Sequence, residues 1–180
     1  MLVGIISVTL HIIIDGYNLI RQSPEMSRLD RIDLQQGREV LLQRLAEYRK
    51  VKAHRITVVF DGTDAPIPGG QRDRFGGVDV RFSRRGEAAD AVIQRMAARE
   101  KERALVVSSD RAVADFAAGR GAAVIDSSDF EARLDLAAAG VSGDGQRPPE
   151  EGWAPTTRKK GPSHRLSKRH RRNRRKIGKL

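Results

Sequence analysis

Residues 11–20 read HIIIDGYNLI, and this stretch decides the fold. Apolar residues run directly into Asp15, which is followed by Gly16, Tyr17 and Asn18. The same pattern recurs at residues 56–61 (ITVVFD) and at residues 104–110 (ALVVSSD). Each segment is typical of a buried strand that stops on a carboxylate. The sequence therefore predicts three strands that end on Asp15, Asp61 and Asp110.

Helical patterns lie between these strands, which predicts an α/β fold with crossover helices and a mainly parallel central sheet. Right-handed crossovers would place the three acids at one carboxyl edge of that sheet. Carboxylates gathered there repel one another unless they share a cation or a proton. The chain has no cysteine and its four histidines are scattered, so oxygen ligands favour Mg²⁺ or Mn²⁺ over zinc.

Further elements are expected along the chain. Helices are predicted at residues 33–50, 88–101 and 110–118, and a last helix should open at a capping box of Ser128 and Glu131. The first of these helices should begin with a capping box of Asp33 and Gln36. Residues 78–82 alternate apolar and charged, which predicts a strand at the sheet edge, and residues 122–125 read as a last buried strand. The second helix carries Asp90 in its first turn, where it would complete the acidic cluster.

Charge is distributed unevenly. Residues 158–180 hold 12 of the 34 Lys and Arg residues and no acid, while residues 1–157 hold the other 22 against all 23 acids. We therefore expect a globular domain at residues 1–140, a flexible linker at 141–157, and a disordered basic tail at 158–180. Dense positive charge gives salt-sensitive, sequence-independent affinity for RNA. The expected RNA-binding residues of the tail are Lys159, Lys160, Arg169, Arg171, Arg172, Arg174 and Arg175.

No segment reaches the ~20 apolar residues of a membrane span. The apolar start, residues 1–14, lacks the basic region and cleavage site of a signal peptide. The absence of cysteine fits a reducing compartment. We expect a cytoplasmic protein without a membrane partner.

Together, DGYN after a strand, VVFD, the GEAAD turn into a helix, and SSD after a later strand resemble the YacP-like branch of the NYN domains, which are related to PIN-type nucleases. The resemblance covers about residues 10–138. It implies a PIN-like three-layer fold and metal-dependent hydrolysis of RNA at an acidic cluster. On matching positions it implies Asp15, Asp90 and Asp110 as metal-site acids with Asn18 beside them, and Asp61 as a less direct ligand. The family's Thr at the start of the helix is replaced here by Ala88, which removes a possible cap or contact near the ligands.

Each feature also has an ordinary structural interpretation. Asp15-Gly16 and Asp61-Gly62 are common turn dipeptides, and Asp90 and Asp110 suit helix starts. Tyr17 can pack in the core or stack on a base, and Ser108 and Ser109 can cap a helix or contact phosphate. The basic tail can serve only solubility or attract membranes.

The favoured hypothesis is a metal-dependent ribonuclease, with Arg84, Arg85 and Arg111 holding the RNA backbone and the basic tail binding messenger RNA, ribosomal RNA or the ribosome. The alternative is a noncatalytic RNA- or ribosome-binding protein on the same fold. A haloacid-dehalogenase-type phosphatase would need a second acid at Tyr17. A Toprim site would need an Asp-x-Asp pair, which the sequence around Asp110 does not supply.

Overall fold

A computed structural model of the chain describes residues 9–62, 72–140 and 168–180. Within these residues a six-stranded sheet has the order β3-β4-β2-β1-β5-β6. Only β3 and β4 pair antiparallel, and every other neighbouring pair is parallel. The strands are β1 (His11–Asp15), β2 (Arg55–Phe60), β3 (Arg72–Phe75), β4 (Val78–Phe82), β5 (Ala104–Val107) and β6 (Ala123–Ile125). The predicted mainly parallel sheet is confirmed.

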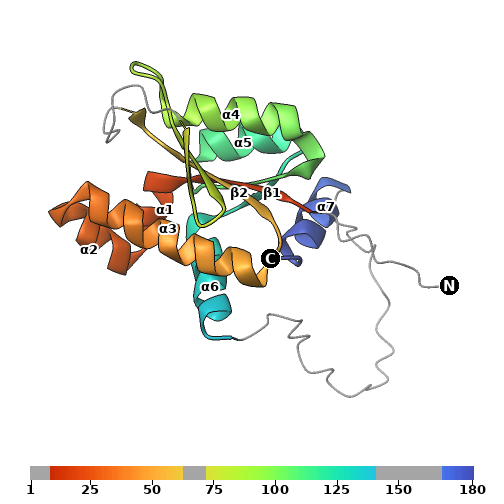
Figure 1. The fold of residues 1–180 in the computed structure, drawn as a ribbon. Helices are drawn as coiled ribbons and strands as arrows, with labels where there is room; N and C mark the ends of the chain where they lie inside the picture. Colours follow the sequence, from red (N-terminus) through yellow and green to blue (C-terminus); the bar gives the residue numbers. More distant parts are fainter. Residues whose placement is uncertain (1–8, 63–71, 141–167) are drawn as a thin grey trace, which may run out of the picture.

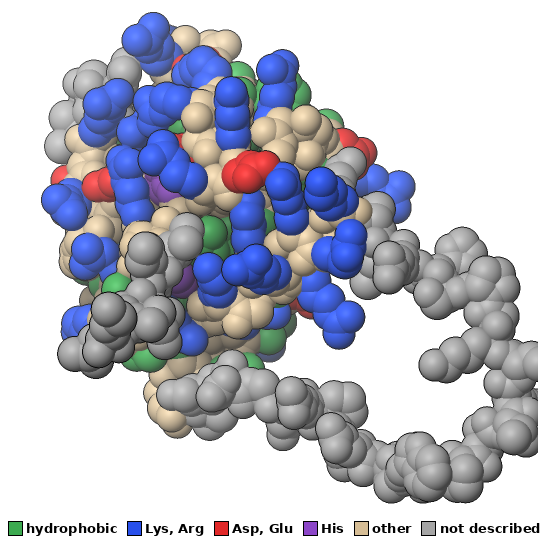
Figure 2. All heavy atoms as spheres, turned by 90° about the vertical axis from the view of Figure 1, so that its right-hand side faces the viewer, with side chains coloured by type: hydrophobic (Ala, Val, Ile, Leu, Met, Phe, Trp, Pro, Cys, Tyr) green, Lys and Arg blue, Asp and Glu red, His purple; other side chains and the backbone are tan. Residues whose placement is uncertain are grey.

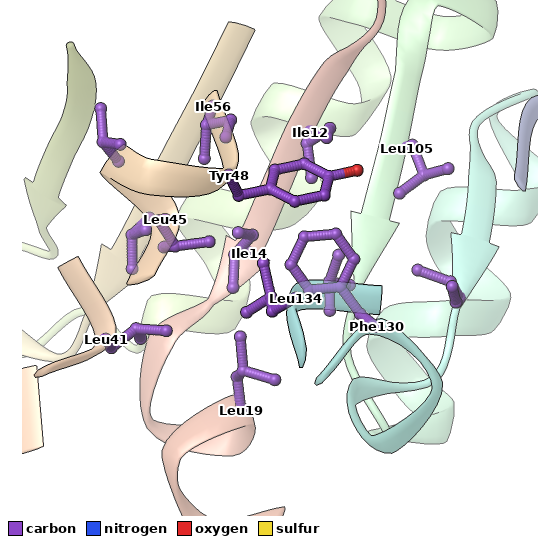
Figure 3. Close-up of a cluster of buried hydrophobic side chains, with 14 of the residues drawn as sticks. Ile12, Ile14, Leu19, Leu41, Leu45, Tyr48, Ile56, Leu105, Phe130 and Leu134 are labelled. Carbon is purple, nitrogen blue, oxygen red and sulfur yellow. The ribbon is translucent and has the colours of Figure 1, made fainter. Parts of the chain in front are cut away.

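Helices cover both faces of the sheet and complete a three-layer fold (Figure 1). Helices α4 (Ala89–Glu100) and α5 (Arg111–Gly119) lie on one face, and a 3-10 turn, η2 (Lys101–Arg103), follows α4. Four helices lie on the other face: α1 (Gly16–Gln22), α2 (Pro24–Ile32), α3 (Leu34–Val51) and α6 (Ser127–Ala138). Each layer buries its own apolar cluster against the sheet. Figure 3 shows Ile12 and Ile14 of β1 against Leu45, Tyr48 and Phe130 from the helices.

The central strands are apolar on both faces because helices cover both faces. In β4, by contrast, Val78 and Val80 are buried while Asp79 and Arg81 are not. This alternation led to the prediction that residues 78–82 form an edge strand, which is wrong, because β3 pairs with β4 on its outer side. Strand β3 reads RDRF and all four of its residues are exposed, so it has no apolar pattern that the sequence could reveal.

Side-chain caps mark the starts of α3 and α6, and one of the two predicted caps is wrong. Asp33 caps α3 as expected, although its carboxylate accepts from the backbone N–H of Gln35 (2.8 Å). The cap of α6 is Asp126, which accepts from the N–H of Ser128 (2.9 Å), so the predicted cap at Ser128 is wrong. Helices α1 and α2 were not anticipated. They begin at the caps Asp15 and Ser23, and Pro24 starts α2.

The end of the chain is ordered. Residues 168–177 form helix α7 (Lys168–Ile177), which packs against β6, and Leu180 is buried in the core. The prediction of a disordered tail is therefore wrong for residues 168–180. Their apolar anchors, Ile177 and Leu180, dock the helix despite its charge. The predicted linker, residues 158–167 with Lys159 and Lys160, and the side chain of Arg169 lie outside the described residues.

The side chain of Asn173 forms two hydrogen bonds with the backbone of β6, the strand at the edge of the sheet. Its oxygen accepts from the N–H of Val124 (2.8 Å), and its amide nitrogen donates to the C=O of the same residue (3.0 Å). One side chain thereby occupies hydrogen-bonding positions that a further strand would use. Among residues 9–62, 72–140 and 168–180, no helix is long and apolar enough to cross a membrane.

Candidate active site

The carboxyl ends of β2, β1 and β5 lie side by side and carry the predicted acids. Asp15 is the last residue of β1, Asp61 directly follows β2, and Asp110 follows β5 after two serines. Asp90 joins them from the first turn of α4. The parallel sheet thus brings all four acids to one edge.

Asp15 is the buried member of the group, with 8% of its surface exposed. Its Oδ1 accepts from the backbone N–H of Asn18 (3.1 Å), and its Oδ2 accepts from the hydroxyl of Ser108 (3.4 Å). Burial, together with the charges of Asp90 and Asp110, raises the pKa of Asp15 to about 6, although the hydrogen bonds from Asn18 and Ser108 oppose the shift. Asp15 therefore sits where its charge is costly in the absence of a cation.

The other acids are more accessible. Burial, followed by the charges of Asp110 and Asp61, raises the pKa of Asp90. Asp110 is exposed and caps α5 by accepting from the N–H of Val113 (3.0 Å). The interpretation of Asp110 as a helix cap is thus confirmed, and Asp15, which was interpreted as part of a turn, caps α1. Both acids also interact electrostatically with the rest of the group.

The donor set at this edge fits a hard divalent cation. Carboxylate oxygens are the ligands that Mg²⁺ and Mn²⁺ prefer. Among the described residues, no three His, Asp or Glu side chains are already arranged to enclose an ion. Mg²⁺ commonly binds through one or two carboxylates and keeps several waters, so buried Asp15 beside half-buried Asp90 and exposed Asp110 suits that mode.

Asn18 is held by a network that the sequence did not reveal. Its Oδ1 accepts from the backbone N–H of Ser109 (2.9 Å) and from the hydroxyl of Ser127 (2.7 Å). The N–H of Ser127 in turn donates to the hydroxyl of Ser109 (3.2 Å). Because two donors face the oxygen, the amide nitrogen of Asn18 must point the other way. Ser127 is 109 residues from Asn18, and no local motif marks the pair.

Close backbone approach explains the glycines after the first two acids. A Cβ at Gly16 would lie 2.4 Å from the Phe60 ring, and one at Gly62 would lie 1.8 Å from the carbonyl oxygen of Ser83. Tyr17 packs rather than stacks on a base, because it is buried edge-to-face against Phe60 with ring centroids 5.2 Å apart.

The two serines before Asp110 do not cap α5, the helix that follows them. The hydroxyl of Ser108 accepts from the N–H of Asp110 (3.1 Å) while it donates to Asp15. The cap of α5 is Asp110 itself. The interpretation of these serines as caps of α5 is therefore wrong, because they join the end of β5 to Asp15 and Asn18.

The predicted cationic residues divide between two sides of the molecule. Arg84, Arg85 and Arg111 are exposed, close in sequence to Asp90 and Asp110. In α7, Arg172 pairs with Glu102 and Lys176 donates to the carbonyl of Gly121 (3.5 Å). Glu102 and Gly121 precede β5 and β6, so this part of α7 lies at the amino edge of the sheet, opposite the acids. The exposed arginines of α7 are Arg171, Arg172, Arg174 and Arg175.

Figure 2 looks onto the side of the molecule where α7 lies. Lys and Arg side chains spread over this side, and few acidic side chains lie between them. The fold thus separates an acidic edge from a basic side.

Comparison with known proteins agrees with the fold. Residues 12–178 match the YacP-like NYN domain, so α7 lies within the matched region. Over 87 residues the chain is 32% identical to the uncharacterized protein YacP of Bacillus subtilis (strain 168), and the match covers 48% of this chain and 50% of that protein. The chain thus matches half the length of this curated relative.

Two crystal structures of Rae1 (YacP) from Bacillus subtilis resemble the fold. One has a TM-score of 0.60 at 27% identity and covers 72% of this chain and 76% of that chain. The other, of a point mutant of Rae1, has a TM-score of 0.63 at 24% identity and covers 73% and 79% of the respective chains. NYN domains are related to PIN-like nucleases. The match over residues 12–178 shows that the chain belongs to the YacP-like NYN domain family.

Proposed function

We propose that this protein is a metal-dependent ribonuclease that hydrolyses RNA phosphodiester bonds at Asp15, Asp90 and Asp110. The observation that carries the proposal is the buried carboxylate of Asp15, whose pKa is raised to about 6 beside two further acids. A carboxylate with a strongly raised pKa among like charges is costly for the fold unless a cation or a proton offsets the charge, and such groups concentrate at functional sites. The family relationship to PIN-like nucleases supports the same reaction class.

Asp15, Asp90 and Asp110 would hold Mg²⁺ or Mn²⁺ directly or through waters, with Asp61 in a less direct role. When bound, such a cation polarises the phosphodiester and assists deprotonation of the attacking water. The protein's own part is to fix the carboxylates. Ser108 donates to Asp15, and the N–H groups of Asn18 and Val113 hold Asp15 and Asp110.

The remaining polar groups would position the RNA. The amide nitrogen of Asn18, turned away from Ser109 and Ser127, is available to donate to a phosphate oxygen. The amino ends of α4 and α5 open at this edge, and their partial positive charges favour an anion there. Arg84, Arg85 and Arg111 would hold the backbone on either side of the reacting phosphate.

Helix α7 would add affinity for RNA or for the ribosome from the opposite side. Its four exposed arginines can neutralise phosphates without reading sequence. This separation from the acids also favours the second candidate function, a noncatalytic RNA- or ribosome-binding protein. The acids argue for the enzyme, because a pure phosphate binder would gain affinity by losing them.

Cleavage of an end-labelled, mixed-sequence single-stranded RNA in Mg²⁺, Mn²⁺ or EDTA tests the proposal. We expect metal-dependent cutting by the wild-type protein and none by Asp15→Asn or Asp90→Asn. The matched control is Asp33→Asn, which changes an exposed aspartate cap at the start of α3 and should leave cutting normal. Tight RNA binding without cutting in any metal would instead identify the binding protein.

A further inference from the structure

The β3–β4 hairpin has one apolar and one charged face. Val78 and Val80 belong to the core cluster that includes α3. Because side chains alternate along a strand, the opposite face of the hairpin carries charged side chains: Arg72, Arg74, Asp79 and Arg81. Cross-strand register sets Arg74 opposite Asp79, and it sets Arg72 directly opposite Arg81.

Two further arginines lie close to this charged face. The Nε of Arg55, at the start of β2, is 3.4 Å from Asp79, and Arg99 near the end of α4 is close enough to lower the pKa of Arg81. We call this set the arginine face; its members are Arg55, Arg72, Arg74, Arg81 and Arg99.

Acidic partners are too few to neutralise the arginine face. Asp79 contacts Arg55 and also Arg74 (3.8 Å). Glu100 contacts Arg99 (3.7 Å) and is shared with Arg103 (3.2 Å). Ion pairs between residues that the structure describes include neither Arg72 nor Arg81. The arginine face thus holds five guanidinium groups, of which Arg55 and Arg74 share Asp79 and Arg99 shares Glu100.

Folding alone gives no reason for this arrangement. Like charges directly opposite each other in an antiparallel pair are destabilising. Burial, followed by the positive charges of Arg72, Arg99 and Arg55, lowers the pKa of Arg81. A bound polyanion would relieve this repulsion, and planar guanidinium groups match phosphate oxygens in bidentate geometry.

We propose that the arginine face binds the phosphodiester backbone of RNA, a site distinct from both the acids and α7. Arg81 lies two residues before Ser83, whose N–H donates to the carbonyl of Phe60 just before Asp61. The face therefore begins beside the acidic edge and extends to Arg55 and Arg99 near the amino ends of the strands. The identity of the polyanion rests on the proposed function, because RNA held at the acids can continue along this face.

The test is fluorescence anisotropy of a labelled 20-nucleotide single-stranded RNA in EDTA over a range of salt. The variant is Arg72→Gln/Arg81→Gln. Its matched control is Arg28→Gln/Arg31→Gln, which removes two exposed arginines from α2 on the opposite face of the sheet. We expect about five- to tenfold weaker binding at low salt and a salt slope smaller by about 1.4 for the first variant only, since each lost phosphate contact on single-stranded nucleic acid removes about 0.7.

Two more measurements separate binding from folding. Arg72→Lys/Arg81→Lys keeps the charge and should retain most of the affinity, while the Gln variant should melt no lower than wild type at low salt because it removes a repulsion. RNA affinity unchanged in the Gln variant, or displacement of RNA by polyglutamate of equal charge as effectively as by unlabelled RNA, would overturn the proposal. Because binding is read without metal, a protein that binds RNA through this face but never cuts would refute only the nuclease.

Discussion

The hydroxyl of Ser127 donates to Oδ1 of Asn18 at 2.7 Å, and this contact ties the start of α6 to the first turn after β1. Ser127 is fully buried, and Asn18 lies three residues after the most buried acid. The bond fixes which end of the Asn18 amide faces the acidic edge. Ser127 is thus a positioning residue for Asn18.

Ser127→Ala should therefore slow RNA cleavage about tenfold, a loss equivalent to about 1.4 kcal/mol, which is within the usual range for one hydrogen bond. The decrease should be in kcat rather than in KM, and Ser127→Thr should restore most of the activity. In the Asn18→Ala background, Ser127→Ala should cause no further loss of activity, because the amide that Ser127 positions is already absent. Equal, additive losses in both backgrounds would show that Ser127 acts only through stability.

Asp15→Asn should stabilise the metal-free protein at neutral pH. The folded pKa of Asp15 is about 6, above its ordinary value of 3.8, so the folded state binds the proton more tightly than the unfolded state. The free-energy cost of the ionised Asp15 to the folded state is absent below pH 4, grows as the pH rises toward 6, and is complete above pH 6. A shift of this size corresponds to about 3 kcal/mol. Asparagine keeps the cap on α1, since it caps as well as aspartate.

Thermal melts in EDTA at pH 4 and pH 7.5 measure this effect. The Tm of Asp15→Asn should exceed that of wild type by several degrees at pH 7.5 only, and added Mg²⁺ should raise the Tm of wild type more than that of the variant. Asp33→Asn, an exposed cap, should change little at either pH. A lower Tm for Asp15→Asn at pH 7.5 would contradict the burial penalty.

The sequence predicts the acidic edge well because each acid follows an uninterrupted apolar strand. Asp15, Asp61 and Asp110 could be placed from local patterns together with the rules for parallel sheets. Ser127 could not, because its role depends on a hydrogen bond to a residue 109 positions away. Local pattern therefore identified the charged groups but not the residue that orients Asn18.

The elements that were missed lack a periodic apolar pattern. All four residues of β3 are exposed, and α7 consists mostly of basic residues. Tertiary contacts hold α7 in place. Leu180 is buried in the core and its carbonyl accepts from the hydroxyl of Tyr48 (3.1 Å), while Asn173 bonds to the edge of β6. Charge density alone wrongly suggested a disordered tail, because a few anchoring contacts outweigh it.

Asn173→Ala should destabilise the protein by about 1–3 kcal/mol, because it leaves the N–H and C=O of Val124 without these partners. Arg175→Ala, an exposed change on the same helix, should leave the unfolding free energy nearly unchanged but weaken RNA binding. Urea unfolding and RNA anisotropy on both variants separate the docking residue from the binding residue. A stable Asn173→Ala protein would mean that the apolar anchors alone hold α7.

Gly16→Ala should destabilise the protein by about 2 kcal/mol or more, because the added methyl would overlap the Phe60 ring at 2.4 Å and Val58 at 2.9 Å. The matched control is Gly119→Ala at the end of α5, where a Cβ meets no atom within 4 Å. There alanine should be neutral or stabilise by up to about 1 kcal/mol, since it is the better helix former. Urea unfolding of both variants makes the comparison. Equal effects would show that the segment after Asp15 can shift away from Phe60. The close packing of Gly16 against β2 would then not fix the position of Asp15.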